Sequence, residues 1–329
     1  MKPRLITISR WRAHRRKLIE RNFIMLRTIT YPCPSDRSMQ PAQVQFAPED
    51  KPRPLVVALH TWSYSYDADC SDYASYCEKY GAHLIFPHFR GPNWTEDALG
   101  SDLAVADIAS AVNYMLESVP VDPARIYLVG GSGGGHMALL MAGRIPELWT
   151  AVSAWCPISD VAAWHRQCSG TRFSGYAEHI EKACGNPPDA EEMAYRSPVT
   201  YLANAVKLPV DIATGIHDGH AGSVPVSQAM NAFNLLAAPE DRFTEEEMDY
   251  VVRNEAAPAH FPVPAADPAY GNTAIHIRRQ SGNARITIFE GAHDSLTEIG
   301  VAWLMKQTRG AAPVWDIGEI TAKAHNLAH

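Results

Sequence analysis

Ser132 is the central residue of the glycine-rich pentapeptide 130–134. The mostly apolar, β-branched run 125–129 precedes it, and the helix-forming run 136–142 follows it. A tight strand-to-helix turn strains the backbone of the serine and leaves no room for bulky neighbours. The N-terminus of the helix then points free N–H groups at any anion that forms beside it. The pattern predicts that Ser132 is the nucleophile of an acyl-transfer reaction.

A glycine-rich phosphate-binding loop is the alternative interpretation of this stretch. A dinucleotide-binding fingerprint requires Gly-x-Gly-x-x-Gly and an acidic residue about 20 positions later. Here the sixth position counted from Gly131 is His136, and the next predicted strand, 150–156, contains no acid. A P-loop needs Gly-Lys followed by Ser or Thr, which is absent from the stretch. We therefore favour the nucleophile and expect no cofactor.

A serine hydroxyl is activated by a histidine base that a carboxylate orients. His293 follows the last predicted strand, 285–289, and Asp218 follows the preceding one, 210–214. Serine, aspartate and histidine in this order along the chain are typical of an α/β-hydrolase. We predict that Ser132, Asp218 and His293 form a catalytic triad.

Asp211 and Asp294 are the rival candidates for the acid. Asp211 lies inside a predicted strand, where an unpaired carboxylate is costly to bury. Asp294 adjoins the histidine, and we expect it to cap the N-terminus of the last helix. A metal site built from His217, His220 and Asp218 would take the acid away from the triad. We therefore predict no bound metal.

The oxyanion formed during acyl transfer needs two N–H donors. Gly133, directly after the nucleophile, is predicted to supply one of them. The second should come from the loop after the predicted strand 55–60. In that loop we nominate the amide of Trp62, with Thr61 as the alternative.

Short apolar strands alternate with longer helical stretches through most of the 329 residues. Strands buried on both faces and joined by helices predict a mainly parallel sheet with helices on both sides. Ligands bind outside the carboxyl ends of such strands, where all the candidates lie. The predicted strands are 55–60, 83–87, 125–129, 150–156, 210–214 and 285–289, and the predicted helices are 67–80, 99–118, a helix after the serine, about 225–237 and 295–309.

Two stretches, 157–205 and 239–283, are too long for plain connections, and we interpret them as cap insertions that cover the site. Residues 46–310 are accordingly predicted to form one α/β-hydrolase domain. Residues 1–45 should hold an amino-terminal extension and leading strands. Residues 311–329 should form a carboxy-terminal tail.

Composition limits the class of protein. Hydrophobic residues make up 46% and charged residues 20%, which predicts a folded core. A net charge of −7 argues against a general nucleic-acid partner. The six cysteines show no metal-binding spacing, and no disulfide framework is expected. No run of 18 apolar residues occurs, so no transmembrane span is expected.

The first 27 residues contain nine basic residues against Glu20 alone, whereas the remaining chain has 20 basic and 35 acidic residues. This basic head lacks the apolar core and cleavage site of a secretory signal, so the cytoplasm is the default location. It is either an arm for an anionic partner or a solvated extension upstream of a start at Met25. We favour the extension.

The chain resembles the catalytic domain of the prolyl-oligopeptidase-like branch of the α/β-hydrolases over about residues 50–309. The motifs that carry the resemblance are Arg90-Gly91, Gly100-Ser101-Asp102, the run 121–126, the pentapeptide 130–134, and Asp218 followed by Val224-Pro225, which resembles the family's Asp-x-x-Val-Pro with three extra residues inserted. The usual His-Gly-Gly-Pro loop is replaced by residues 60–63, His-Thr-Trp-Ser. The resemblance implies the fold and the triad but not the substrate.

Oligopeptidases of that branch carry an amino-terminal propeller, and the roughly 50 residues before the first core strand cannot build one. The resemblance implies that small members without it are often esterases, including ones that deacylate plant polysaccharides. We predict a serine carboxylic-ester hydrolase acting on a small-molecule or oligosaccharide ester, such as an acetylated or feruloylated carbohydrate. A peptidase of the same mechanism and a non-catalytic binding protein of this fold are the alternatives.

Aromatic residues near the strand ends offer a further indication of the substrate. Exposed rings stack on sugar faces or on aromatic acyl groups, whereas ordinary packing is the alternative. The candidates for substrate binding are Tyr64, Trp94, Trp155, Trp164 and His217, the last of which adjoins the predicted acid.

Overall fold

A computed structural model describes residues 26–320 and 325–327 of the chain. The expectation for the basic head concerns residues that lie, apart from positions 26 and 27, outside the described residues. No helix in the described ranges is both long enough and apolar enough to span a membrane.

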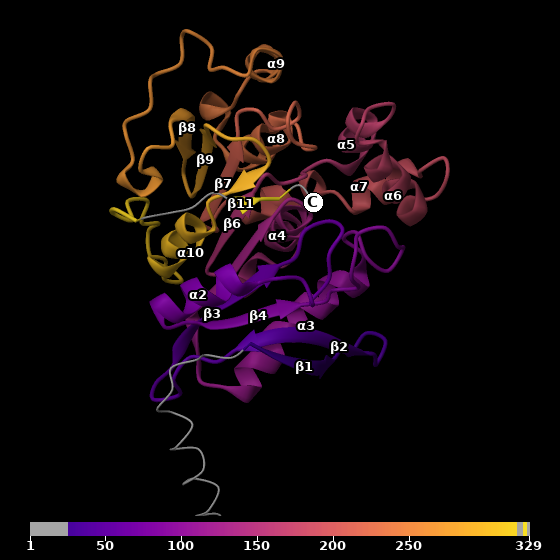
Figure 1. Cartoon of the computed structure of the whole chain (residues 1–329), viewed down its shortest axis with the longest axis vertical. Coiled ribbons are helices and arrows are strands. Elements are labelled where there is room, and N and C mark those ends of the chain that lie inside the picture. The colour runs from indigo at the N-terminus through magenta and orange to yellow at the C-terminus, as the bar shows by residue number, and fades with distance from the viewer. Residues whose placement is uncertain (1–25, 321–324, 328–329) are drawn as a thin grey trace, which may run out of the picture.

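Nine strands of the described chain form one sheet in the order β1-β2-β4-β3-β5-β6-β7-β9-β8, seen in Figure 1. The run from β4 to β9 in this order is parallel, and antiparallel strands lie at both edges. The strands are β1 Arg27–Pro32, β2 Met39–Gln45, β3 Arg53–Leu59, β4 His83–Pro87, β5 Val121–Gly131, β6 Ala151–Trp155, β7 Val210–Gly215, β8 Ile275–Ser281 and β9 Ala284–Phe289, with the separate pair β10 Asp294–Ser295 and β11 His325–Asn326.

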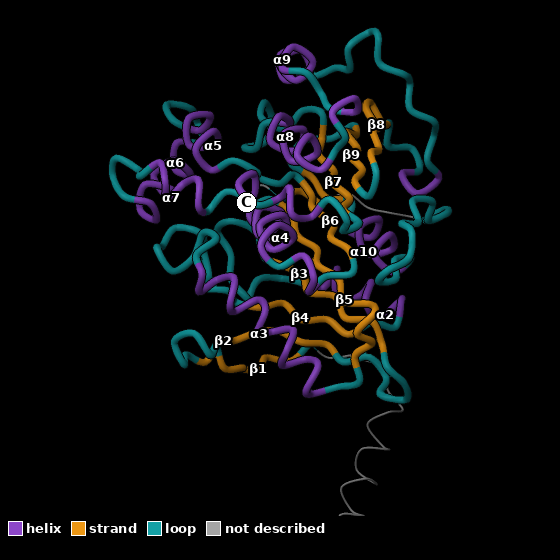
Figure 2. Tube along the Cα trace, turned by 180° about the vertical axis from the view of Figure 1, so that it is seen from behind, coloured by secondary structure: helices purple, strands orange, loops and turns teal. Residues whose placement is uncertain are grey.

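Helices cover both faces of the sheet. Helices α3, α4 and α8 pack on one face, and α2 and α10 pack on the other, as Figure 2 shows. This arrangement confirms the predicted α/β-hydrolase fold class. The helices are α2 Ser71–Tyr80, α3 Asp102–Ser118, α4 Gly133–Arg144, α5 Val161–Cys168, α6 Ser174–Cys184, α7 Ala190–Tyr195, α8 Val226–Leu236, α9 Glu245–Asn254 and α10 Thr297–Met305.

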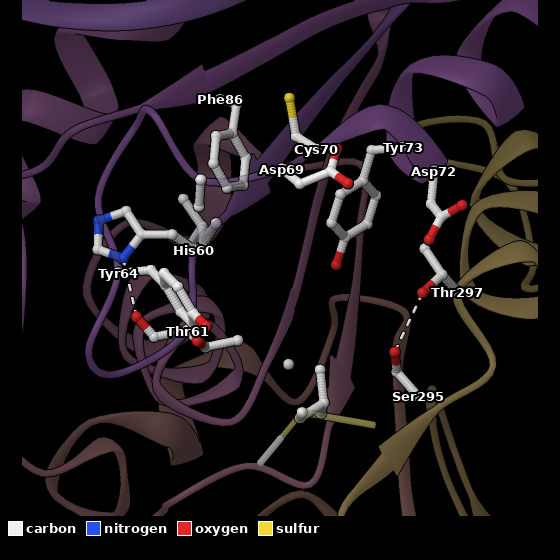
Figure 3. A pocket seen from close by; sticks show the side chains of 14 residues that line it. His60, Thr61, Tyr64, Asp69, Cys70, Asp72, Tyr73, Phe86, Ser295 and Thr297 are labelled. Carbon is white, nitrogen blue, oxygen red and sulfur yellow. Dashed lines mark hydrogen bonds between the residues drawn. The ribbon is translucent and has the colours of Figure 1, made fainter. Parts of the chain in front are cut away.

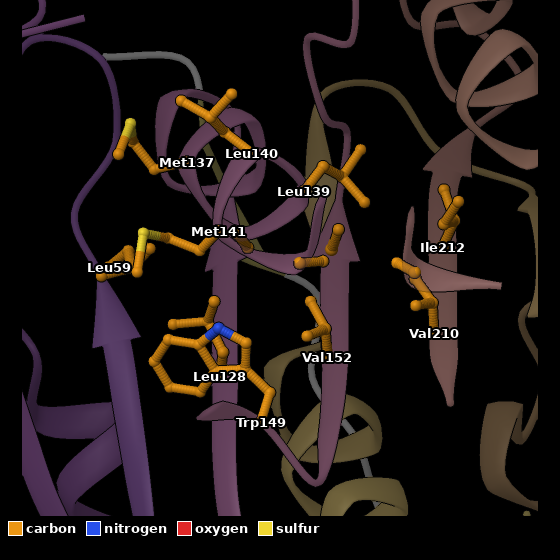
Figure 4. Close-up of a cluster of buried hydrophobic side chains, with 14 of the residues drawn as sticks. Leu59, Leu128, Met137, Leu139, Leu140, Met141, Trp149, Val152, Val210 and Ile212 are labelled. Atoms are coloured by element: carbon orange, nitrogen blue, oxygen red, sulfur yellow. The ribbon is translucent and has the colours of Figure 1, made fainter. Parts of the chain in front are cut away.

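The central strands are buried on both faces, so that alternate side chains enter two different cores. In β3, Leu55, Val57 and Leu59 belong to the core under α3, α4 and α8. Val56 and Ala58, between them, belong to the core under α2 and α10. Figure 4 shows the first core, where leucines of α4 pack onto the central strands. The packing of these two cores fixes the positions of the strand ends from which the site is built.

The first predicted insertion forms α5, α6 and α7, which share a small apolar cluster with Trp62, Leu99 and Val224 from other loops. The second insertion holds α9, but its last part, 275–281, is the edge strand β8 rather than part of a cap. The sequence signal for this strand is weak because only Ile277 and Ser281 of its seven side chains are buried. The expectation of a cap is therefore wrong for these residues.

The helix starts differ by a few residues from those predicted. Helix α3 begins at Asp102 rather than at 99 because the side chain of Ser101 accepts a hydrogen bond from the amide of Ala104 and fixes the N-cap there. Helix α2 begins at Ser71 rather than at 67. The predicted tail contributes β11, which pairs with β10 directly after His293.

Candidate active site

Ser132 occupies the turn between β5 and α4. Its backbone has φ 56° and ψ −120°, a conformation that side-chain-bearing residues rarely adopt. Its amide donates to the carbonyl oxygen of Trp155 on the neighbouring strand at 2.9 Å. A Cβ on Gly130 would lie 2.4 Å from the carbonyl carbon of Gly134. The glycines are therefore required where the end of β5 passes the first turn of α4.

Asp218 follows β7 and His293 follows β9, and the two side chains form a buried pair. Asp218 Oδ2 accepts a hydrogen bond from His293 Nδ1 at 2.7 Å, and both residues are 1% exposed. Asp218 Oδ1 accepts from the amides of Gly219 and Val224, which fixes the carboxylate. The other imidazole nitrogen, Nε2, is buried and has no hydrogen-bond partner within the described ranges. This nitrogen is the one available to accept a proton.

Two sets of contacts connect the Asp218–His293 pair to the carboxyl end of β5, where Ser132 lies. The carbonyl of Trp155 accepts the hydrogen bond from the Ser132 amide. The next residue is Cys156, whose sulfur lies within 4.8 Å of a carboxylate oxygen of Asp218 and of an imidazole nitrogen of His293. On the other side, the amide of Leu327 donates to the carbonyl of His293 at 2.8 Å. The Leu327 side chain packs on the residue before Ser132, since a Cβ at Gly131 would lie 2.8 Å from it. The three predicted triad residues thus lie at the carboxyl ends of strands in the same part of the sheet, and among the described residues no hydrogen bond joins Ser132 to His293 Nε2.

Cys156 is a residue at the site that sequence reasoning missed, because no motif marks it. Its thiol donates to the carbonyl oxygen of Asp294 at 3.2 Å. Burial, reinforced by the nearby carboxylate of Asp218, raises the pKa of the Cys156 thiol well above its usual value. The thiol is therefore neutral at physiological pH, and serine rather than this cysteine is suited to act as nucleophile.

Cys156, Asp218 and His293 are also the one group of potential metal ligands in the part of the chain that the structure describes. Asp218 and His293 are already engaged with each other, so a metal ion would have to replace their hydrogen bond. His217 is instead held between Glu255 and Glu290. The alternative set of His217, His220 and Asp218 is not gathered by the fold.

The two rival aspartates have other partners. Both carboxylate oxygens of Asp211 accept from the guanidinium of Arg285 at 2.8 Å, and both residues are buried. Asp294 accepts from the amide of Ala292 at 2.8 Å. The expectation that Asp294 caps the last helix is wrong, because α10 starts after Leu296 without a side-chain cap. The short strand β10 separates this aspartate from the helix.

The two nominated oxyanion donors lie against each other. The backbone nitrogen of Trp62 is 2.5 Å from the point that a Cβ on Gly133 would occupy. Gly133 is the first residue of α4, so its amide is one of the free N–H groups at the helix start. The carbonyl of Trp62 accepts from the amide of Asn93 at 2.9 Å, which ties this loop to the segment after β4.

A pocket of about 310 Å³ reaches the nucleophile turn at Gly131, although Ser132, Asp218 and His293 are not among its lining residues. Thr61 and Gly131 are among its lining residues, and Tyr64 and Tyr73 contribute aromatic rings, as Figure 3 shows for Thr61 and the two tyrosines. Ser295 and Thr297 add two hydroxyl groups that hydrogen-bond each other at 3.0 Å. With the carboxylates of Asp69 and Asp72, which also line the pocket, these rings and hydroxyls suit a ligand that has both apolar faces and hydrogen-bond donors at its edges.

The predicted substrate-binding aromatic residues divide into two groups. Tyr64 is 39% exposed and lines the pocket, and Trp94 is partly buried against His179, with ring centroids 4.7 Å apart. Trp155 and Trp164 are each 1% exposed, so the expectation that they stack on substrate is wrong. The indole of Trp155 packs in the α2–α10 core, and that of Trp164 packs in the cluster beneath α5 and α6. The sequence pattern does not separate core from surface for a tryptophan near a strand end.

His217 binds carboxylates rather than lining this pocket. Its Nδ1 lies 2.6 Å from Glu255 and its Nε2 lies 2.9 Å from Glu290. The hydrogen bond to Glu255, which outweighs burial, raises the pKa of His217 above its usual value, and Glu290 adds to the effect. The imidazole thereby links the end of α9 to the loops that carry Asp218 and His293.

Replacement of His217 by glutamine is expected to lower the melting temperature more at pH 6 than at pH 9. Because the folded-state pKa is raised, the stabilisation is fully present below the unfolded-state pKa of about 6.5 and is lost as pH rises through the folded-state value. Thermal unfolding of both proteins across this range measures the difference. Glu255→Gln should show the same trend, and a difference that grows with pH would contradict the prediction.

A model of the prolyl oligopeptidase family matches residues 72–256, more than half of the chain. The chain is 26% identical over 230 residues to the acylamino-acid-releasing enzyme of Rattus norvegicus, covering 64% of this chain and 31% of that protein. It is 33% identical over 112 residues to feruloyl esterase B of Neurospora crassa, covering 30% of this chain and 36% of that protein. The chain therefore spans about a third of the length of these relatives.

A solved structure of Pyrococcus horikoshii acylaminoacyl peptidase superposes with a TM-score of 0.53 at 18% identity. The superposition covers 68% of this chain and 36% of that one. At this identity the likeness establishes the fold. It agrees with the sheet order and helix layers described above.

Proposed function

This chain belongs to the prolyl oligopeptidase family of serine hydrolases, and we propose that it hydrolyses carboxylic esters through an acyl-enzyme. The observation that carries the proposal is the buried hydrogen bond between Asp218 and His293. It lies at the carboxyl ends of the strands, where Ser132 also lies with its strained backbone. A carboxylate, an imidazole with one free nitrogen and a serine at a helix N-terminus are the groups that acyl transfer needs.

In the proposed reaction, Ser132 Oγ attacks the ester carbonyl carbon while His293 Nε2 accepts the hydroxyl proton. Asp218 keeps the imidazole in the tautomer with its proton on Nδ1 and stabilises the imidazolium that forms. The amides of Gly133 and Trp62 bind the oxyanion, each typically contributing about 3–4 kcal/mol. The imidazolium then protonates the departing alcohol. Water, deprotonated by the same imidazole, releases the acid and restores the serine.

The proposed substrate class is acylated carbohydrate, with an acetyl or feruloyl group as the acyl part. The rings of Tyr64 and Tyr73, which line the same pocket as the hydroxyls of Ser295 and Thr297, support it, because sugar rings and phenolic acids combine apolar faces with hydrogen-bonding edges. The pocket volume of about 310 Å³ suits one such ring rather than an extended chain. The likeness to a feruloyl esterase adds support.

A serine peptidase is the second candidate, because the acylamino-acid-releasing relative aligns over more of the chain than the esterase does. The same triad cleaves esters and amides, so the two candidates differ in which leaving group the pocket accepts. A non-catalytic binding protein is the third, and it requires an unreactive Ser132.

A substrate panel tests the proposal. Acetylated and feruloylated oligosaccharides, p-nitrophenyl acetate and N-acetylalanine p-nitroanilide would be assayed in parallel with the wild-type protein. We expect turnover of the carbohydrate and aryl esters and none of the anilide. Turnover of simple esters alone would overturn the carbohydrate assignment, and preferred cleavage of the anilide would favour the peptidase. Failure of a fluorophosphonate probe to label the protein would indicate the non-catalytic alternative.

A further inference from the structure

Asn93 lies in the segment between β4 and α3, and its side chain is fully buried at 0% exposure. Its amide nitrogen Nδ2 has no hydrogen-bond partner in the described part of the chain. Buried side-chain donors are nearly always paired in folded proteins, because leaving one unpaired costs the free energy of removing it from water. Such a donor is free to bind an acceptor on a ligand that lies beside it.

The orientation of the Asn93 amide is determined by its other end. Asn93 Oδ1 accepts a hydrogen bond from the backbone N–H of Leu99 at 3.1 Å. A flipped amide would place its NH₂ group against that N–H, with two donors facing each other. The oxygen must therefore face Leu99, and Nδ2 must be the atom on the opposite side.

Nδ2 lies at the start of α4, among the nominated oxyanion donors. It is 3.0 Å from the point that a Cβ on Gly133 would occupy, and the backbone nitrogen of Trp62 is 2.5 Å from the same point. The backbone N–H of Asn93 separately binds the carbonyl of Trp62 at 2.9 Å. One residue thus fixes the loop that presents Trp62 and adds its own unpaired donor beside it.

We propose that Asn93 is a further catalytic residue, whose Nδ2 donates a third hydrogen bond to the oxyanion of the tetrahedral intermediate. This inference rests on the proposed ester hydrolysis by Ser132. Full negative charge on the carbonyl oxygen exists only in the transition state and intermediate, so the added donor acts on kcat rather than on substrate binding. Asn93 also supplies a side-chain donor next to the loop 60–63, in which His-Thr-Trp-Ser replaces the usual His-Gly-Gly-Pro.

Two variants test the role of Nδ2. Asn93→Ala removes the donor, and Asn93→Asp keeps an acceptor for Leu99 while replacing the donor by an oxygen. With p-nitrophenyl acetate, kcat and kcat/KM of both variants should fall equally, by about 10²–10³-fold, with little change in KM. The inhibition constant of an arylboronic acid, which forms a tetrahedral adduct with the serine, should rise by a similar factor.

Asn234 provides the matched control. Both ends of its amide bind the backbone of Phe243 at 2.8 Å, outside the site. Asn234→Ala should therefore lower the melting temperature and leave kcat unchanged. The proposal is wrong if folded Asn93→Ala retains kcat within about threefold of wild type, or if KM alone rises while boronate inhibition is unchanged.

A measurement on the wild-type protein decides the case if neither variant folds. With selective ¹⁵N-asparagine labelling, one side-chain NH₂ resonance should move downfield when the boronate adduct forms, and no such movement would overturn the proposal. Ser132→Ala, assayed in parallel, separates the two levels of inference. If it retains full esterase activity, the proposed function fails. If it is inactive while the Asn93 variants match wild type, only the role of Asn93 fails.

Discussion

Replacement of Ser132 by alanine is expected to lower kcat for p-nitrophenyl acetate by about 10⁵–10⁶-fold, the loss typical of removing a serine nucleophile. Asp218→Asn should cost about 10⁴-fold, because an amide at this position favours the wrong imidazole tautomer. The difference between the two losses follows from geometry. Asp218 acts only through its 2.7 Å hydrogen bond to His293, whereas Ser132 supplies the attacking atom.

The fold should survive the Ser132→Ala substitution. The turn is fixed by the close approach of Gly130 and Gly134 and by the amide of Ser132, which alanine retains. Loss of fluorophosphonate labelling, measured by intact mass, should accompany an unchanged melting temperature. Ser110→Ala, a substitution of a buried serine on α3, is the matched control and should keep full activity. Retained activity in Ser132→Ala would remove this serine from the mechanism.

Replacement of Arg285 by methionine is expected to lower the free energy of unfolding by about 3–5 kcal/mol. Asp211 and Arg285 are directly paired across β7 and β9, with relative side-chain exposures of 1% and 4%. Removal of the guanidinium leaves Asp211 as a buried carboxylate without its partner, which is the costly state. Equilibrium unfolding in urea measures the loss.

Two further variants show whether the unpaired charge is the cause. The double substitution Asp211→Leu with Arg285→Met removes both charges and should recover much of the lost stability. Arg125→Met breaks a partly exposed ion pair with Asp122 and should cost at most about 1 kcal/mol. A double variant no more stable than Arg285→Met would mean that lost packing, including the contact of Arg285 with Trp315, dominates. Because β7 and β9 lead into Asp218 and His293, the pair also holds the strands that deliver the proposed acid and base.

The element pattern was readable from sequence where the signal is local. Apolar runs such as 83–87 form strands that are buried on both faces, and the helices that connect these strands carry an apolar stripe. The order of strands and helices therefore follows from hydrophobic periodicity. The edge strand β8 was not predicted because only Ile277 and Ser281 of its side chains are buried. Strand β11 was not predicted because two residues are too few to show a hydrophobic pattern. An edge strand is specified by the neighbour that it pairs with.

The site shows the same division. A serine among glycines at a strand end, followed by an acid and a histidine after later strands, was enough to nominate Ser132, Asp218 and His293. The side-chain environment was not predictable, because it depends on residues distant in sequence. Trp155 and Trp164 were nominated as substrate-binding residues, yet packing with other elements buries them.

The sequence by itself therefore determined the fold class and the order of the groups that could do chemistry, since these follow from backbone periodicity and local strain, and its motifs carried the resemblance to the family. Only the tertiary structure decided what surrounds those groups. It paired Asp211 with Arg285, placed the thiol of Cys156 beside the candidate acid and base, and brought the unpaired side-chain nitrogen Nδ2 of Asn93 close to Gly133. Each of these contacts joins separate strands or loops, and no local pattern encodes which of them meet.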